Sequence, residues 1–99
     1  MTDYKAYVDQ DLEVLIPGFM DNRRDEIDSL RDLLRQEDFS AIENLGHAIK
    51  GTGGGYGFDK ITDLGAEIEE ASKDRDSELL KQLIIDLEEY LDNVEIIYQ

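Results

Sequence analysis

The 99-residue sequence contains no cysteine, one proline, one histidine and no long apolar run. Without cysteine it cannot form a disulfide framework, a thiolate metal site or a cysteine nucleophile, and this composition fits the reducing cytoplasm. No segment approaches the roughly 18 apolar residues of a membrane span. The acidic N-terminus also lacks the cationic and apolar segments of a signal peptide. We therefore expect a cytoplasmic protein that does not enter the membrane.

Basic residues are also scarce, since 25 acidic residues accompany only 10 basic ones and the net charge is -15. Such a field repels a phosphate backbone, so nucleic acid and anionic membranes are poor partners. A partner with a basic rim would be attracted. The charge is spread along the chain and is not gathered in a tail, so it does not indicate disorder.

Valine and threonine are sparse, and the strand-like alternation of apolar and polar residues is absent. Apolar residues instead recur every three or four positions, which predicts amphipathic helices. They do so in four segments, residues 25–39, 41–49, 61–71 and 78–98. The last three segments have residues suited to capping a helix at its start: Asp38 or Ser40, Asp59, and Asp76 or Ser77.

The connections between these segments are short, as antiparallel neighbours in a bundle require. A further short helix is predicted over Asp9 to Ile16, with Pro17-Gly18 marking a kink or a break. Ninety-nine residues leave no room for a second core, so residues 1–99 should form one domain. The predicted fold is all-α, an up-down antiparallel four-helix bundle with a short N-terminal helical lead-in.

The only histidine lies beside a concentration of glycine, with five glycines among residues 51–57. On a helical wheel Ile42, Leu45 and Ile49 mark the bundle face, and His47 lies roughly opposite it. Each glycine inside a helix costs roughly 1 kcal/mol relative to alanine. A face stripped of side chains would let another macromolecule approach the imidazole. The residues expected on this exposed face beside the histidine are Lys50, Gly51, Gly54 and Phe58.

Several other readings of this region fail on its residue types and spacing. A Walker-type phosphate loop needs Gly-Lys, whereas the order here is Lys-Gly, and the dinucleotide pattern G-x-G-x-x-G places Tyr56 where its third glycine should be. A metal site would need several ligands, whereas the sequence has one histidine and no cysteine. An exposed imidazole can shuttle protons, sense pH or act as a nucleophile. Attack on a phosphoryl group delivered by another protein needs no pocket in this chain.

The stretch "HAIKGTGGGYGFDKITDLGAEIEEA", residues 47–71, resembles the histidine-containing phosphotransfer (HPt) domains of two-component phosphorelays. The resemblance extends over the whole chain, because that family is a four-helix bundle of about this size. It implies that His47 carries a phosphoryl group on Nε2 and that Lys50 stabilises the added charge. It also implies that Glu69 hydrogen-bonds Nδ1 and so orients the ring.

The same resemblance implies that Gly51 gives clearance to a docking domain and that Gly57 lies where the chain turns after the histidine helix. With Gly54 on the bare face, these glycines are the expected binding residues. The partners would be response-regulator receiver domains and a sensor or hybrid histidine kinase. Mg²⁺ would be supplied by the receiver, and no cofactor, metal or ATP site is expected in this chain.

The expected function is that of a stand-alone phosphorelay intermediate, a phosphohistidine carrier more than a turnover enzyme. It would accept a phosphoryl group from a receiver aspartate or a kinase and pass it to another receiver aspartate. The partner should dock on the exposed side of the histidine helix and on the neighbouring helix around Glu26 to Arg31. The alternative is an acidic helical interaction module that binds a receiver or another partner without phosphotransfer.

Overall fold

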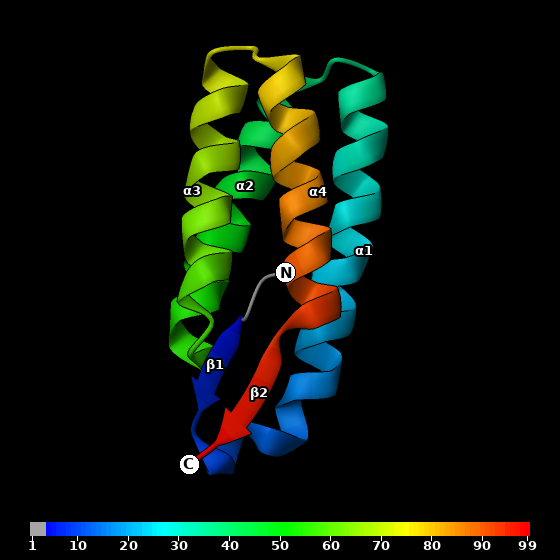
Figure 1. Cartoon of the computed structure of the whole chain (residues 1–99). Helices are drawn as coiled ribbons and strands as arrows, with labels where there is room; N and C mark the ends of the chain where they lie inside the picture. Colours follow the sequence, from blue (N-terminus) through cyan, green and yellow to red (C-terminus); the bar gives the residue numbers. More distant parts are fainter. Residues whose placement is uncertain (1–3) are drawn as a thin grey trace.

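The computed structural model describes residues 4–99, within which four α-helices pack side by side (Figure 1). The helices are α1 (Ile16–Arg35), α2 (Phe39–Gly53), α3 (Asp59–Lys73) and α4 (Ser77–Asn93). The predicted all-α four-helix bundle is therefore confirmed. None of the helices in this described part of the chain combines the length and the apolar character needed to cross a bilayer.

The helix starts follow the capping residues for α2 and α4 but not for α3. Asp38 accepts a hydrogen bond from the Ala41 N–H at 3.2 Å, and Asp76 does the same for α4. For α3 the predicted cap is wrong, because Phe58 occupies the N-cap position and Asp59 is the first helical residue. Phe58 is fully buried, so core packing sets this start, while the Asp59 carboxylate lies in the first turn, where the helix dipole favours an anion.

The predicted helical lead-in is a 3₁₀ helix, η1 (Gln10–Leu15), whose N-cap Asp9 accepts a hydrogen bond from the Asp11 N–H at 2.9 Å. It runs directly into α1, which begins at Ile16 and so starts well before the predicted segment 25–39. Pro17 lies in the first turn of α1, where its missing N–H is not needed. The Pro-Gly pair therefore marks the beginning of α1 and does not interrupt it.

Two short strands, β1 (Lys5–Val8) and β2 (Glu95–Tyr98), pair in parallel beside the bundle, with Lys5 opposite Glu95 (Figure 1). The expectations of a helix reaching residue 98 and of no strand-like alternation are wrong here. In β1 the side chains alternate between exposed and buried, with Ala6 and Val8 turned inward. Val94 has an extended backbone and ends α4, so the chain leaves the helix before β2.

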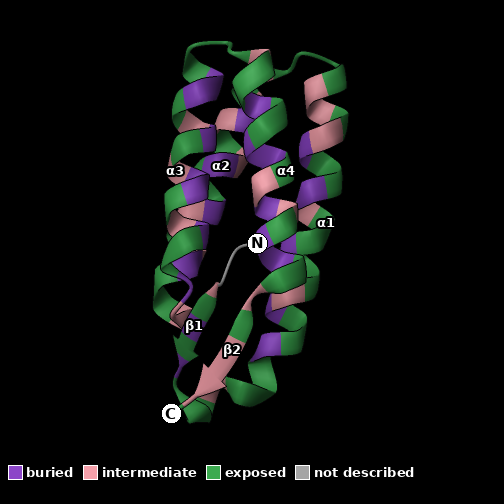
Figure 2. Cartoon of the chain, viewed as in Figure 1, coloured by how far each residue is buried: buried purple, intermediate pink, exposed green. Residues whose placement is uncertain are grey.

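The core lies along the axis of the bundle, and Figure 2 shows the buried residues of each helix on its inward side. The largest fully buried side chains come from every helix, among them Leu30, Ile42, Ile49, Ile61, Ile68 and Leu87. At the lower end, Phe19 of α1 stacks on Phe58 with ring centroids 5.1 Å apart and also contacts Tyr56 at 4.6 Å. These rings fix the start of α1 against the turn that joins α2 to α3.

Candidate functional site

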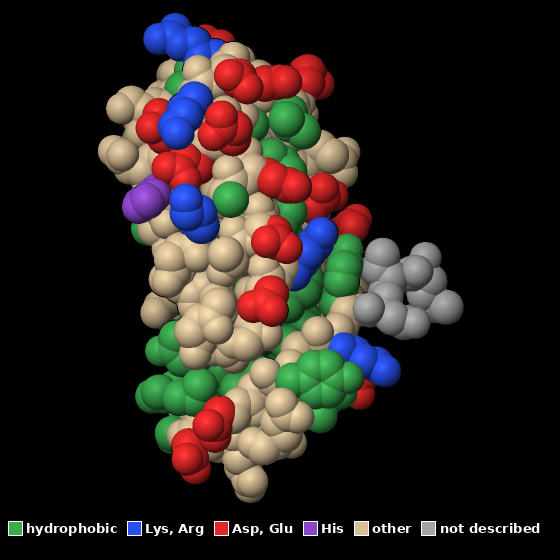
Figure 3. All heavy atoms as spheres, turned by 90° about the vertical axis from the view of Figure 1, so that its left-hand side faces the viewer, with side chains coloured by type: hydrophobic (Ala, Val, Ile, Leu, Met, Phe, Trp, Pro, Cys, Tyr) green, Lys and Arg blue, Asp and Glu red, His purple; other side chains and the backbone are tan. Residues whose placement is uncertain are grey.

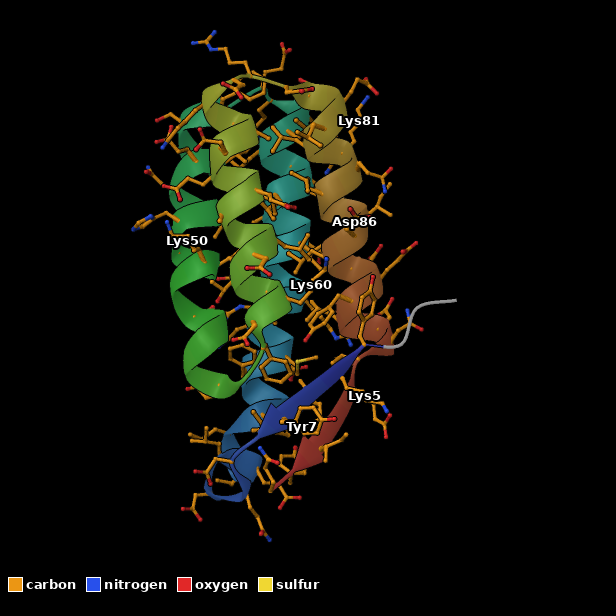
Figure 4. All side chains as sticks on the ribbon, turned by 60° about the vertical axis from the view of Figure 1, so that its left-hand side comes forward. Lys5, Tyr7, Lys50, Lys60, Lys81 and Asp86 are labelled. Atoms are coloured by element: carbon orange, nitrogen blue, oxygen red, sulfur yellow. The ribbon has the colours of Figure 1, made fainter. Side chains whose placement is uncertain are left out.

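His47 and Lys50 lie three residues apart in α2, which places their side chains on the same face of the helix. The His47 side chain is 68% exposed and that of Lys50 is 42% exposed. Figure 3 shows the histidine at the surface beside basic and acidic side chains, and Figure 4 shows Lys50 directed away from the bundle. An incoming group can therefore reach the outer edge of the imidazole.

Glu69 comes from the neighbouring helix α3 and contacts both residues of α2. Its Oε2 lies 3.1 Å from His47 Nδ1, and its Oε1 lies 3.3 Å from Lys50 Nζ. An ionised carboxylate only accepts hydrogen bonds, so Nδ1 carries the ring proton and donates it to Glu69. In the neutral imidazole the Nε2 lone pair is then free, and this is the atom that can act as a nucleophile.

Glu69 is the residue of this trio with the least exposed side chain, at 15%. Burial opposes its ionisation, but the hydrogen bonds and charges of Lys50 and His47 outweigh that effect and lower the pKa of Glu69 below the ordinary value of 4.5. The carboxylate is therefore charged throughout the neutral range. One negative charge is shared between an imidazole and an ammonium group.

This lowered pKa predicts a measurable dependence of stability on pH. Because the folded pKa of Glu69 is depressed, its contribution to folding is fully present above the unfolded value near 4.5 and is lost as pH falls through the lower folded value. We expect Glu69→Gln to make the free energy of unfolding less dependent on pH in this acidic range, measured by urea denaturation. Glu67→Gln, at an exposed position of the same helix, is the control. Equal slopes for both variants would contradict the prediction.

The glycines after the histidine differ in what surrounds them. A Cβ placed on Gly51 or Gly55 would meet no other atom within 4 Å, and one on Gly54 would make only an ordinary contact with Thr62 Oγ1 at 3.6 Å. Gly57 is different, because its φ is +93° and the Tyr7 carbonyl oxygen leaves no room for a Cβ. Gly51, Gly54 and Gly55 therefore form a bare surface, whereas Gly57 forms the turn.

Phe58 does not share the exposed face with His47, and this part of the wheel prediction is wrong. Its side chain is fully buried. The α-helix ends at Gly53, a single 3₁₀ turn η2 (Gly54–Tyr56) follows, and Gly57 reverses the chain. Helical spacing measured from His47 therefore no longer applies when the chain reaches Phe58.

A groove of about 400 Å³ lies between the start of α1 and the end of α2. Its lining residues are Leu15, Gly18, Phe19, Asn22, Arg23, Thr52 and Tyr56. The buried Arg23 guanidinium pairs with Glu26 and lies 4.8 Å from the centre of the Phe19 ring. Further along α1, the Arg31 side chain points towards α4 and donates a hydrogen bond to Glu88 at 2.7 Å. The docking region expected around Glu26 to Arg31 stays a prediction.

Sequence reasoning missed two glycines that lie inside the bundle, Gly46 and Gly65. A Cβ on Gly46 would lie 2.9 Å from the Glu69 backbone nitrogen, and one on Gly65 would lie 2.4 Å from that of Lys50. Both are buried in helix interiors, where glycine is unfavourable unless another backbone comes close. Glycine at these interior helical positions was therefore the signal in the sequence that could have indicated a close contact between two helices.

Comparison with known protein families supports the assignment that this geometry suggests. The model of the Hpt domain family matches residues 14–96, which include all four helices and end within strand β2. The comparisons with curated proteins and with solved structures gave no match. The match covers most of the chain and confirms the resemblance of residues 47–71. The chain therefore belongs to the Hpt domain family, the histidine phosphotransfer domains of phosphorelays.

Proposed function

We propose that this chain is a phosphorelay carrier in which His47 accepts a phosphoryl group from a receiver aspartate or a kinase and passes it to another receiver aspartate. The observation that carries the proposal is the contact of 3.1 Å between His47 Nδ1 and Glu69 Oε2. It holds the ring proton on Nδ1 and leaves Nε2 unprotonated on the exposed side of α2. The family assignment indicates the class of reaction, and this contact indicates which ring nitrogen is the nucleophile.

In the transfer step the Nε2 lone pair of His47 attacks the phosphorus of an aspartyl phosphate in line with the bond that breaks. An N–P bond forms, the P–O bond breaks, and the aspartate leaves as a carboxylate through a loose, metaphosphate-like state. The ring keeps its proton on Nδ1 and becomes positively charged. The Glu69 carboxylate stabilises this charge, in the way that an orienting carboxylate serves a catalytic imidazole. Transfer to the second aspartate reverses these changes.

Lys50 stabilises the negative charge of the phosphoryl group, although its ammonium is paired with Glu69 before the transfer. Its ammonium lies 3.3 Å from Glu69 Oε1, on a half-exposed and flexible side chain. Partly exposed ion pairs of this kind contribute only about 0–1 kcal/mol, so the ammonium can move to the phosphoryl oxygens at little cost. The receiver supplies Mg²⁺ and most of the remaining charge stabilisation.

The receiver docks on the surface that continues from His47 towards the lower end of the bundle. We define this docking face by the bare glycines Gly51, Gly54 and Gly55 and by the neighbouring groove at the start of α1. Leu15 lines that groove and is 51% exposed, and Val14 beside it is 83% exposed. Figure 3 shows a broad area of backbone and uncharged groups beneath the histidine, with hydrophobic side chains at its lower edge. The bare surface gives the receiver clearance, and the apolar edge gives it an anchor.

The docking face makes a prediction about affinity. Leu15→Asp should weaken binding of a receiver domain by about tenfold, because it places a charge in the apolar anchor of the interface. Leu79→Asp is the matched control, since Leu79 is 45% exposed and lies on α4. Isothermal titration calorimetry with both variants compares the two positions. Equal weakening by Leu15→Asp and Leu79→Asp would contradict the assigned face.

The test of the proposed function is transfer of a labelled phosphoryl group. The chain is incubated with Mg²⁺ and a receiver carrying labelled phosphoaspartate, and the products are separated. We expect label on this chain that is labile to acid and stable to base, as phosphohistidine is, and mass spectrometry should locate it on the peptide that contains His47. Absence of label, or label on another residue, would overturn the proposal.

A further inference from the structure

Helices α2 and α3 come into close backbone contact where two glycines face each other, Gly46 in α2 and Gly65 in α3, which we call the glycine crossing. A Cβ on Gly65 would lie 2.4 Å from the Lys50 nitrogen, 2.8 Å from the Lys50 Cα and 2.9 Å from the Gly46 oxygen. A Cβ on Gly46 would lie 2.9 Å from the Glu69 nitrogen and 3.1 Å from the Gly65 oxygen. The two backbones are therefore in direct contact at this point.

The atoms at the glycine crossing belong to the residues of the site. Gly46 precedes His47 in the chain, Gly65 lies one helical turn before Glu69, and the backbone of Lys50 rests against Gly65. The Glu69 carboxylate reaches across the same gap between the helices to both His47 and Lys50. The separation of the backbones at the crossing thus sets how far the carboxylate must reach.

We propose that Gly46 and Gly65 are positioning residues for phosphotransfer. By keeping α2 and α3 in backbone contact, they hold the Glu69 carboxylate within hydrogen-bond distance of His47 Nδ1 and so fix the ring proton away from Nε2. This inference rests on the proposed function of His47, and it adds two residues that touch neither the phosphoryl group nor the partner.

The distances show why even a methyl group at Gly65 matters. Ordinary contacts of a Cβ begin near 3.4 Å, so a side chain there requires the helices to separate locally by about 1 Å. The contacts of Glu69 with His47 and Lys50 are already 3.1 and 3.3 Å, close to the outer limit of a hydrogen bond. A separation of about 1 Å transmitted to the carboxylate breaks at least one of them. Misplacement of this size at a reacting group can cost up to about a hundredfold in rate.

The experiment compares wild type, Gly65→Ala and Gly46→Ala in two assays that need no docking partner. The first is ¹⁵N NMR of the imidazole, which reports whether Nδ1 or Nε2 carries the proton. The second is the rate at which phosphoramidate, a small phosphoryl donor, labels His47. We expect Gly65→Ala to shift the ring towards the Nε2–H form and to slow labelling about tenfold. Gly46→Ala should do the same more weakly, because its clash is smaller.

A double-mutant cycle separates positioning from a general loss of structure. In the Glu69→Ala background the crossing has no carboxylate left to position, so adding Gly65→Ala should slow labelling no further. Ile84→Val, a buried change on α4, is the control for a modest loss of stability and should leave both assays unchanged. Circular dichroism confirms that each variant is folded. If Gly65→Ala does not fold, Gly46→Ala provides the cycle.

The outcomes distinguish this inference from the function on which it rests. An unchanged tautomer in Gly65→Ala, or equal slowing with and without Glu69, would overturn the positioning role. Failure of wild-type His47 to take label from any donor would overturn the proposed function. The NMR assay would still decide whether the glycine crossing controls the ring proton, because it requires no phosphoryl transfer.

Discussion

Replacing His47 with glutamine is expected to abolish all phosphoryl transfer to the chain. The substitution removes the Nε2 lone pair, which is the only proposed nucleophile. The glutamine amide can still donate a hydrogen bond towards Glu69, so the change disturbs the surroundings little. The residue is 68% exposed and carries no core packing, so the free energy of unfolding should change by less than about 0.5 kcal/mol. Transfer is measured as label passed from a phosphorylated receiver in the presence of Mg²⁺.

The same variant separates a carrier from a simple interaction module. Binding of the unphosphorylated receiver, measured by calorimetry, should be nearly unchanged in His47→Gln, because the docking face is intact. Label that persisted in the variant would show that another residue is the acceptor. A wild-type chain that binds the receiver and takes no label would instead be the non-catalytic module considered from the sequence.

The helices were predictable because each has a long apolar stripe, and in α2 and α4 a capping aspartate also marks the start. Ile61, Leu64 and Ile68 repeat at helical spacing, and all three side chains are buried in the core. The strands were not predictable in this way. Each is four residues long, and Lys5 pairs with Glu95 at the far end of the chain, so the signal lies in tertiary packing and not in either segment.

In the site, too, the residues of one helix were predictable from local sequence, and the contact between helices was not. His47 and Lys50 share one helix, so their spacing alone places them on one face. Glu69 belongs to a different helix and has glutamate neighbours at positions 67 and 70, and only the family resemblance distinguished it. Which glutamate reaches the imidazole depends on how α2 and α3 cross. That crossing is set by backbone contact at Gly46 and Gly65, which no pattern of apolar residues reveals.

The turn after the histidine helix gives the second large prediction, which concerns stability. Gly57→Ala is expected to lower the free energy of unfolding by about 2–5 kcal/mol. The backbone at Gly57 is left-handed, with φ at +93°, and a residue with a Cβ is disfavoured there by about 1–2 kcal/mol. The new Cβ would also lie 2.3 Å from the Tyr7 carbonyl oxygen of β1, an overpacked contact that costs about 1–3 kcal/mol more.

Gly51→Ala is the matched control, because it makes the same chemical change four residues after His47 in the same helix. Nothing lies within 4 Å of a Cβ at Gly51, and alanine is the better helix former, so this variant should gain about 0.5–1 kcal/mol. Urea denaturation should therefore move in opposite directions for the two substitutions. A domain of this size has about 5–15 kcal/mol of total stability, so the loss at Gly57 would be a large part of it. A loss of only about 1–2 kcal/mol for Gly57→Ala would be explained by the left-handed backbone alone. That result would contradict a tight contact between β1 and the turn, and with it a role for the terminal strands in stabilising the end of the histidine helix.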